Sequence, residues 1–130
     1  MDEGGGLDGR GGPEARGGLR LEGLAKRFGD VAAVDGVDLE LPPGQLISVL
    51  GPSGCGKTTM LRMIAGLERP TEGRIFLDGE DVTDRPAHTR DIGMVFQSLA
   101  LFPHLNVAGN VGYGMRIRGV PKDRTDARVE

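Results

Sequence analysis

The sequence predicts an α/β fold in which a small antiparallel sheet precedes a buried strand and a helix. Leu19–Leu24 and Val37–Leu41 carry apolar residues in the spacing of half-buried strands. Gln45–Leu50 is a short apolar run of the kind that a parallel sheet buries on both faces. Helical spacing of apolar residues follows soon after that run. With 130 residues, the chain has room for one domain at most.

The first eighteen residues differ in composition from the rest of the chain. Eight of the 23 glycines lie there, and the two larger apolar residues, Met1 and Leu7, show no periodicity that would bury a face. Such a segment cannot bury enough apolar surface to offset the entropy of ordering. We therefore expect residues 1–18 to form a disordered tail and residues 19–130 to form the domain.

The elements at the start of the domain follow from its apolar pattern and its breaker residues. The two half-buried strands resemble an antiparallel pair, and Pro42–Gly44 separates them from the next strand. Apolar residues from Met60 to Leu67 recur at helical spacing, so we expect a helix there. Gly66 and Pro70 supply its end.

The second half of the chain predicts shorter elements. Arg74–Leu77 has the composition of a strand, and the dipeptide that follows it, Asp78-Gly79, favours a tight hairpin turn because both residues tolerate positive φ. A polar loop then runs through Arg90. Ile92–Phe96 is a further strand candidate.

Two helices are expected towards the end of the chain. Asn106 is placed to cap a helix that runs towards Arg118, although three glycines within it weaken helix formation. Lys122–Glu130 has the pattern of a helix, and no stop signal follows it. The sequence therefore predicts that the chain ends inside an element.

Composition excludes several classes of function. The net charge is −3, from 16 basic and 19 acidic side chains, which argues against a nucleic-acid partner held by a general basic field. A single cysteine excludes a disulfide framework and a cysteine-rich zinc site. Neither a secretory signal nor a membrane-spanning stretch is present, so we expect a cytoplasmic product whose membrane role runs through a partner.

One segment carries a specific chemical signal. Residues 51–58 match G-x-x-x-x-G-K-[ST], the Walker A pattern. Its backbone N–H groups and the positive end of the following helix receive phosphates, Lys57 reaches the β and γ phosphates, and the Thr58 hydroxyl ligates Mg²⁺. The nucleotide-binding residues expected here are Gly51, Pro52, Ser53, Gly54, Cys55, Gly56, Lys57, Thr58 and Thr59.

Two other interpretations of this loop are weaker. A mere glycine-rich turn is disfavoured because the pattern lies between an expected buried strand and an expected amphipathic helix. A dinucleotide-binding G-x-G-x-x-G pattern fails, because Gly54 and Gly56 are followed three residues later by Thr59. The sequence therefore predicts a P-loop NTPase (RecA-like) core that follows an N-terminal antiparallel β subdomain.

The flanks of the loop carry a resemblance to one family. The segments LERPTEGRIFLDGEDVT and RDIGMVFQSLALFPHLNVAGNV resemble the ATP-binding subunits of ABC transporters, especially importers that serve sugar, polyamine and iron permeases. The likeness runs from about residue 19 to the end of the chain. A P-loop kinase or GTPase is disfavoured, because a base-reading NKxD pattern is absent.

The resemblance implies further site residues. Phe28 matches the aromatic residue that stacks on adenine, where tyrosine is commoner, and the alternative is a phenylalanine buried in the core. Gln97 matches the Q-loop glutamine that ligates Mg²⁺ and senses the γ phosphate. The apolar loop Gln97–Val107 matches the region that docks against the permease, the alternative being that its apolar residues cover the core.

The resemblance also implies what these residues lack. The family's Walker B aspartate, general-base glutamate, signature sequence and switch histidine do not occur, so we expect a fragment that ends before the helical subdomain. One hypothesis is the amino-terminal part of an ATPase subunit that dimerises and powers import from the inner membrane face, with polyamine as the favoured cargo. The alternative is a truncated nucleotide-binding module without ATPase activity of its own.

Overall fold

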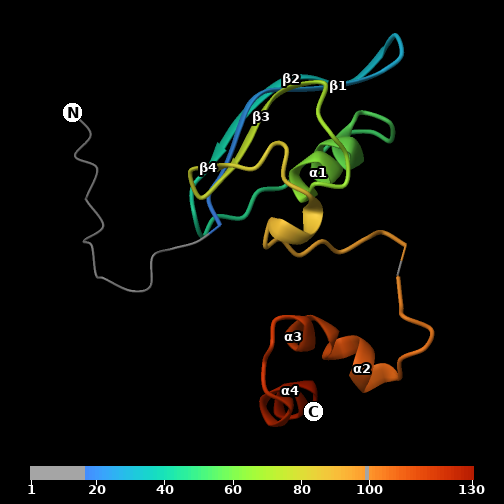
Figure 1. Ribbon diagram of the computed structural model, residues 1–130. Coiled ribbons are helices and arrows are strands. Elements are labelled where there is room, and N and C mark those ends of the chain that lie inside the picture. Colours follow the sequence, from blue (N-terminus) through green and yellow to red (C-terminus); the bar gives the residue numbers. More distant parts are fainter. Residues whose placement is uncertain (1–16, 99) are drawn as a thin grey trace. The chain divides into compact units, whose positions relative to one another are not determined.

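A computed structural model describes residues 17–98 and 100–130 (Figure 1). The expected disordered tail, residues 1–18, lies almost wholly outside the described residues. The chain divides into two compact units, one that ends at Gly93 and one that spans Met94–Glu130.

The first unit contains a four-stranded antiparallel sheet in the order β2-β1-β3-β4 (Figure 1). Its strands are β1 (Leu19–Phe28), β2 (Val31–Leu41), β3 (Glu72–Leu77) and β4 (Glu80–Asp81). The expected antiparallel pair is confirmed, with Leu21 opposite Leu39. The predicted Arg74–Leu77 strand is confirmed as part of β3.

A bulge in β1 lets two leucines at odd spacing face the same core. Leu21 pairs with Leu39 but Leu24 pairs with Val37, so β1 has one residue more than β2 between these pairs. Gly23 adopts φ 53 and its N–H donates to the Asp38 carboxylate at 2.7 Å. Strict alternation would place Leu21 and Leu24 on opposite faces, and the extra residue corrects this.

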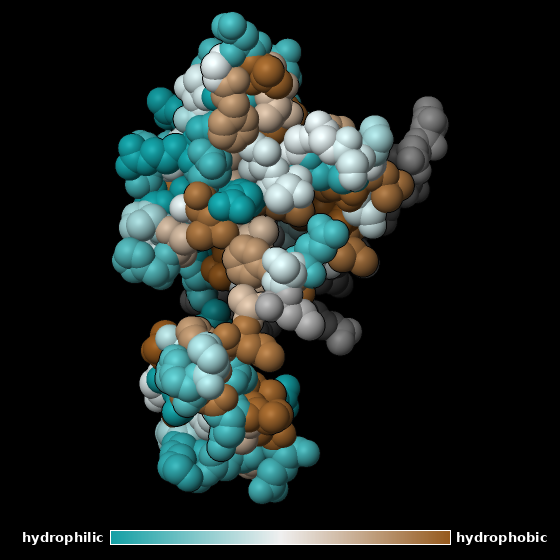
Figure 2. All heavy atoms as spheres, turned by 90° about the vertical axis from the view of Figure 1, so that its right-hand side faces the viewer, coloured by the Kyte–Doolittle hydropathy of each residue, from teal (hydrophilic) through white to brown (hydrophobic). Residues whose placement is uncertain are grey.

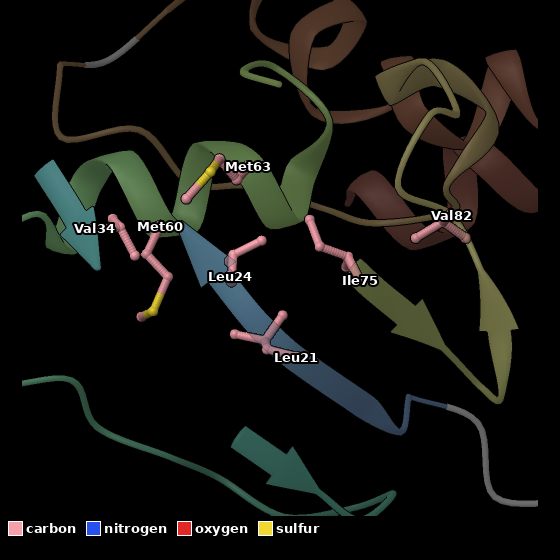
Figure 3. Packing of buried hydrophobic residues seen from close by; sticks show 7 residues of the cluster. All are labelled: Leu21, Leu24, Val34, Met60, Met63, Ile75 and Val82. Atoms are coloured by element: carbon pink, nitrogen blue, oxygen red, sulfur yellow. The ribbon is translucent and has the colours of Figure 1, made fainter. Parts of the chain in front are cut away.

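The helix α1 (Lys57–Ala65) packs on one face of the sheet. Figure 3 shows Met60 of this helix beside Val34 of β2, with Leu24 of β1 under the helix. The helix ends at Gly66, whose φ of 82 is a left-handed conformation that suits glycine. The predicted helix and its stop are therefore confirmed. The core cluster consists of Leu21, Leu24, Val34, Met60, Met63, Ile75 and Val82.

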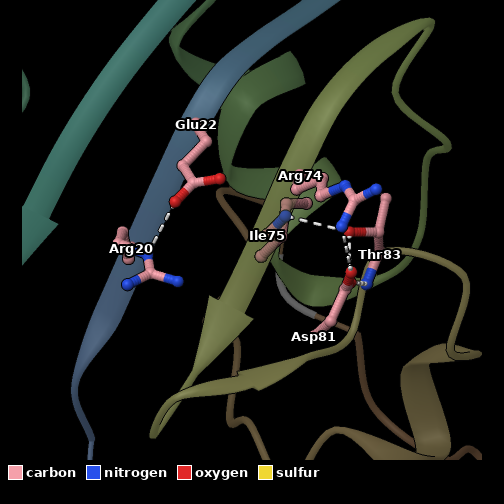
Figure 4. A network of polar contacts seen from close by, with 6 residues as sticks. All are labelled: Arg20, Glu22, Arg74, Ile75, Asp81 and Thr83. Atoms are coloured by element: carbon pink, nitrogen blue, oxygen red, sulfur yellow. Dashed lines mark hydrogen bonds and ion pairs between the residues drawn. The ribbon is translucent and has the colours of Figure 1, made fainter.

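The predicted turn between β3 and β4 is also confirmed. Asp78 and Gly79 both have positive φ, as a type I′ hairpin requires. Next to it, the Thr83 hydroxyl donates to the Asp81 carboxylate at 2.6 Å and accepts from the Ile75 N–H at 3.0 Å (Figure 4). This network fixes the chain as it leaves the hairpin.

Two strand predictions are wrong. Gln45–Leu50 and Ile92–Phe96 form neither strand nor helix, and Leu46 is 97% exposed while Val95 is 94% exposed. A strand needs a partner for its backbone N–H and C=O groups, and no described residue supplies one beside these segments. Apolar side chains of both segments accordingly reach the surface. Figure 2 shows apolar surface, in brown, on the face that it draws.

The second unit contains the short helices α2 (Val107–Val111) and α3 (Tyr113–Ile117) and the helix α4 (Lys122–Val129). The Asn106 side chain accepts from the Gly109 N–H at 2.8 Å, so its predicted capping role is confirmed. The single helix expected towards Arg118 is divided at Gly112. A Cβ at Gly112 would lie 2.9 Å from the Thr125 methyl group, so glycine permits the close approach of α4.

Candidate functional site

The loop Gly51–Gly56 leads directly into the first turn of α1. Gly54 and Gly56 have φ of 83 and 90, and Gly56 is the N-cap residue of the helix. Among the described residues no side chain caps this end, and its first turn contains no acidic residue. The first N–H groups of the helix and its positive dipole end are therefore available to an anion.

The glycines of this loop are needed for different reasons. A Cβ at Gly56 would lie 2.0 Å from the backbone oxygen of Ala33 in β2, and a Cβ at Gly51 would lie 2.6 Å from the Cys55 sulfur. A Cβ at Gly54 would meet nothing within 4 Å, although its φ favours glycine. The fold itself therefore requires glycine at position 56, where the loop touches the sheet.

The two chemically important side chains of the loop lie at the start of α1. The Lys57 ammonium donates to the Gly51 carbonyl, so the lysine reaches back across the loop. Thr58 is exposed, and its hydroxyl has no hydrogen-bond partner among the described residues. Both side chains therefore lie beside the glycine-rich backbone, as the Walker A pattern predicts.

A cavity of about 370 Å³ adjoins this loop. One wall comes from β2, a second from the extended segment before the loop, and a third from the loop and α1. Its size is within the usual range of small-molecule sites. The lining residues are Ala32, Ala33, Val34, Asp35, Val37, Val49, Leu50, Cys55, Gly56, Lys57 and Met60.

Phe28 belongs to the same unit, at the end of β1. Its ring is 50% exposed, so the alternative of a core phenylalanine is wrong. The Lys26 ammonium lies 5.1 Å from the ring centroid and 2.7 Å from the Glu68 carboxylate. The hydrogen bond from Lys26 holds the pKa of Glu68 below its ordinary value. The adenine-stacking role of Phe28 stays a prediction.

Gln97 belongs to the other unit. It is exposed, and it lies in the irregular segment before α2. The structure therefore places the glycine-rich loop and Phe28 in one compact unit and Gln97 in the other. The prediction that Gln97 and Thr58 share a magnesium ion is not tested.

The predicted docking loop is exposed but internally ordered by a residue that sequence analysis missed. Asn110 accepts from the Phe102 N–H at 2.9 Å and donates to the Leu105 carbonyl at 3.1 Å and the Asn106 carbonyl at 3.0 Å. The Phe102 ring contacts that of Tyr113, with centroids 4.3 Å apart and the ring planes tilted by 38°. No spacing rule marks an asparagine inside a helix as the hub of the preceding loop.

The structure also shows that Arg90, which the sequence places in a polar loop, is buried. It is only 6% exposed, and burial lowers the pKa of its guanidinium. It donates to the Met63 and Ile64 carbonyls at the end of α1, and to two carbonyls of its own loop. A lone arginine in a polar stretch gives no sequence signal for such burial.

Over the described residues, every helix falls short of the length and apolar character that a membrane span requires.

Known proteins resemble this chain in both sequence and structure. It is 55% identical over 112 residues to the Fe(3+) ions import ATP-binding protein FbpC of Escherichia coli (strain K12), and 51% identical over 112 residues to FbpC 1 of Haemophilus influenzae. The matches cover 86% of this chain, but 32% and 34% of those proteins. The chain thus spans about a third of the length of the curated relatives it matches.

The solved structures agree with this likeness. A dimeric post-hydrolysis ATP-binding cassette bound to ADP and Pi is 30% identical, with a TM-score of 0.75 over 85% of this chain and 53% of the cassette. A nucleotide-free cassette is 34% identical, with a TM-score of 0.52 over 54% of this chain and 28% of that one. The fold is therefore the α/β P-loop NTPase fold that the sequence predicts, over the part of the cassettes that this chain matches. Since the model of the ABC transporter family matches residues 34–130, well over half of the chain, this protein belongs to the ABC transporter family.

Proposed function

We propose that this chain is the amino-terminal part of the ATP-binding subunit of an ABC importer, and that it binds ATP with Mg²⁺ at the loop Gly51–Thr59. One observation carries the proposal: an uncapped helix N-terminus follows a glycine-rich loop, and Lys57 lies across that loop. N–H groups, a helix dipole and an ammonium converge there, which is the donor set that a polyphosphate needs.

The residues of the loop have different roles in nucleotide binding. The backbone of Gly51–Gly56 receives phosphate oxygens, and Lys57 balances their charge once it leaves the Gly51 carbonyl. The free, exposed Thr58 hydroxyl fits Mg²⁺, which prefers oxygen ligands. Gln97 is the second protein ligand in this proposal, and Phe28 stacks on the base.

The role of the chain in a whole transporter rests on its relatives. The loop Gln97–Val107 docks against the permease in this proposal, because its exposed Leu101 and Val107 give it an apolar surface. A second ATP-binding subunit completes the site, as the dimeric cassette suggests. The protein then lies on the cytoplasmic side of the membrane through its permease.

Fe(3+) is the proposed cargo. The curated relatives are named for Fe(3+) import. Their names do not support polyamine, the cargo that the sequence around Gln97 favoured. Hydrolysis belongs to the whole protein in this proposal, since positioning and charge neutralisation supply most phosphoryl-transfer catalysis and this chain supplies the phosphate-binding part.

The experiment is a titration of the chain with Mg²⁺-ATP. Lys57→Ala removes a charge-assisted hydrogen bond to phosphate and should weaken binding by about tenfold or more. Lys122→Ala is the matched control, because Lys122 is a lysine of the other unit that pairs with Asp126. Equal affinity of the unaltered chain and Lys57→Ala, or no binding by the unaltered chain, would refute the proposal.

A further inference from the structure

The helix α1 is held at its rear end by a buried cation. Arg90 donates from Nη1 to the Met63 carbonyl at 2.8 Å and the Ile64 carbonyl at 3.0 Å. From Nε and Nη2 it donates to the Arg85 carbonyl at 2.9 Å and the Thr83 carbonyl at 3.1 Å. One planar guanidinium therefore joins the last turn of α1 to the loop that follows β4.

The Arg90 guanidinium, a fork of N–H donors, lies where its charge stabilises the carboxyl-terminal end of α1. The carbonyl end of a helix is the negative end of its dipole, so a cation there is favourable. All four of these acceptors are neutral backbone oxygens. A lysine would supply a point charge without the fixed fork, so arginine is specific to this geometry.

The contact is close as well as directional. Gly66 follows the helix, and a Cβ there would lie 2.8 Å from the Arg90 Nε and 2.9 Å from the Ala87 Cα. The loop can approach α1 this closely because residue 66 has no side chain. A bulkier residue would push the guanidinium away from its acceptors.

The core under α1 fixes the orientation of the helix less strictly. Met60 and Met63 of α1 belong to the core cluster (Figure 3), and the half-buried Ile64 packs against it. Methionine is flexible and fits many packings, and apolar contact is not directional. Hydrogen bonds depend on angle, so the bonds from Arg90 define the tilt of α1 better than these apolar contacts do.

We propose that Arg90 is a positioning residue for the phosphate-binding loop, acting through α1. The inference rests on the proposed nucleotide site. The nine residues of α1 form a rod about 13 Å long, with the loop at one end and Arg90 at the other. A tilt of α1 at its carboxyl-terminal end therefore displaces the N–H groups and Lys57 at its amino-terminal end.

The test compares Mg²⁺-ATP affinity with thermal stability in three variants of the full chain. Arg90→Met removes the fork, and Arg90→Lys keeps the charge without it. Val82→Ala is the matched control. Val82 follows β4 and belongs to the core cluster, so this substitution opens space there without removing a hydrogen bond to α1. All affinities are measured well below the unfolding midpoint of each variant.

We expect Arg90→Met to weaken binding by about tenfold, which is the effect of losing one charge-assisted hydrogen bond to phosphate. The affinity of Arg90→Lys for Mg²⁺-ATP should lie between that of Arg90→Met and that of the unaltered chain. Val82→Ala should lower the unfolding midpoint and leave affinity within about twofold.

Two outcomes overturn the inference: unchanged affinity in Arg90→Met, or an equal loss of affinity in Val82→Ala. If Arg90→Met does not fold, Arg90→Lys decides, and affinity equal to that of Val82→Ala overturns it. A failed proposed function looks different, because Lys57→Ala would then bind as the unaltered chain does. If Lys57→Ala loses affinity for Mg²⁺-ATP while Arg90→Met keeps it, only the role of Arg90 is refuted.

Discussion

The strand β1 and the segment Gln45–Leu50 both contain leucines, but these leucines differ in burial. Leu24 of β1 is fully buried, whereas Leu46 is 97% exposed. β1 has a hydrogen-bonded neighbour on each side, and Gln45–Leu50 has none among the described residues. The difference teaches that apolar character buries a strand only where neighbouring backbone satisfies its polar groups.

The sharpest way to break this comparison is to shorten one leucine in each region. Leu24→Ala should lower the free energy of unfolding by about 2–5 kcal/mol, because it removes buried methyl groups and leaves a cavity. Leu46→Ala should change it by less than about 0.5 kcal/mol, since its side chain already faces water. Urea denaturation of both variants measures this, and equal losses would contradict the comparison.

The glycine-rich loop that follows Gln45–Leu50 and leads into α1 gives a second test. Gly56→Ala should cost more than about 2 kcal/mol, because positive φ disfavours alanine and its Cβ would collide with the Ala33 oxygen. Gly54→Ala carries the φ cost alone, about 1 kcal/mol. Denaturation midpoints compare the two, and a larger loss in Gly54→Ala would exclude contact with β2 as the cause.

The exposed loop before α2 sharpens the comparison from the other unit. It resembles Gln45–Leu50 in exposure, but Asn110 binds its backbone. Asn110→Ala should lower the stability of the second unit by about 1–2 kcal/mol, the net value of one or two hydrogen bonds. Amide hydrogen exchange over residues 100–112 measures this. Asn106→Ala, which removes only the cap, should cost about 1 kcal/mol, and an equal or larger effect there would contradict the hub role.

The smallest effect concerns pH at the edge of the sheet. The Thr83 hydroxyl and N–H hold the pKa of Asp81 below its ordinary value. A lowered folded-state pKa gives stability that is present above the unfolded pKa and is lost as pH falls through the folded value. The stability difference between the chain and Asp81→Asn should therefore shrink from about pH 6 to about pH 3. A difference independent of pH would refute this link.

Local signals in the sequence were enough for much of the site. Spacing placed the loop before α1, and Gly66 ended the helix as predicted. Asp78 and Gly79 formed their turn, and Asn106 its cap. These features depend on backbone conformations and hydrogen bonds within a few residues, so the short segment itself contains the information.

The sequence by itself determined the phosphate-binding pattern, the antiparallel hairpins and the family to which they point. Only the tertiary structure showed that Gln45–Leu50 and Ile92–Phe96 have no strand partner within residues 17–98 and 100–130, that a bulge at Gly23 turns two leucines to one face, and that Arg90 is buried behind α1. Each of these depends on residues distant in the chain, because a side chain or a strand is buried only when another segment reaches it.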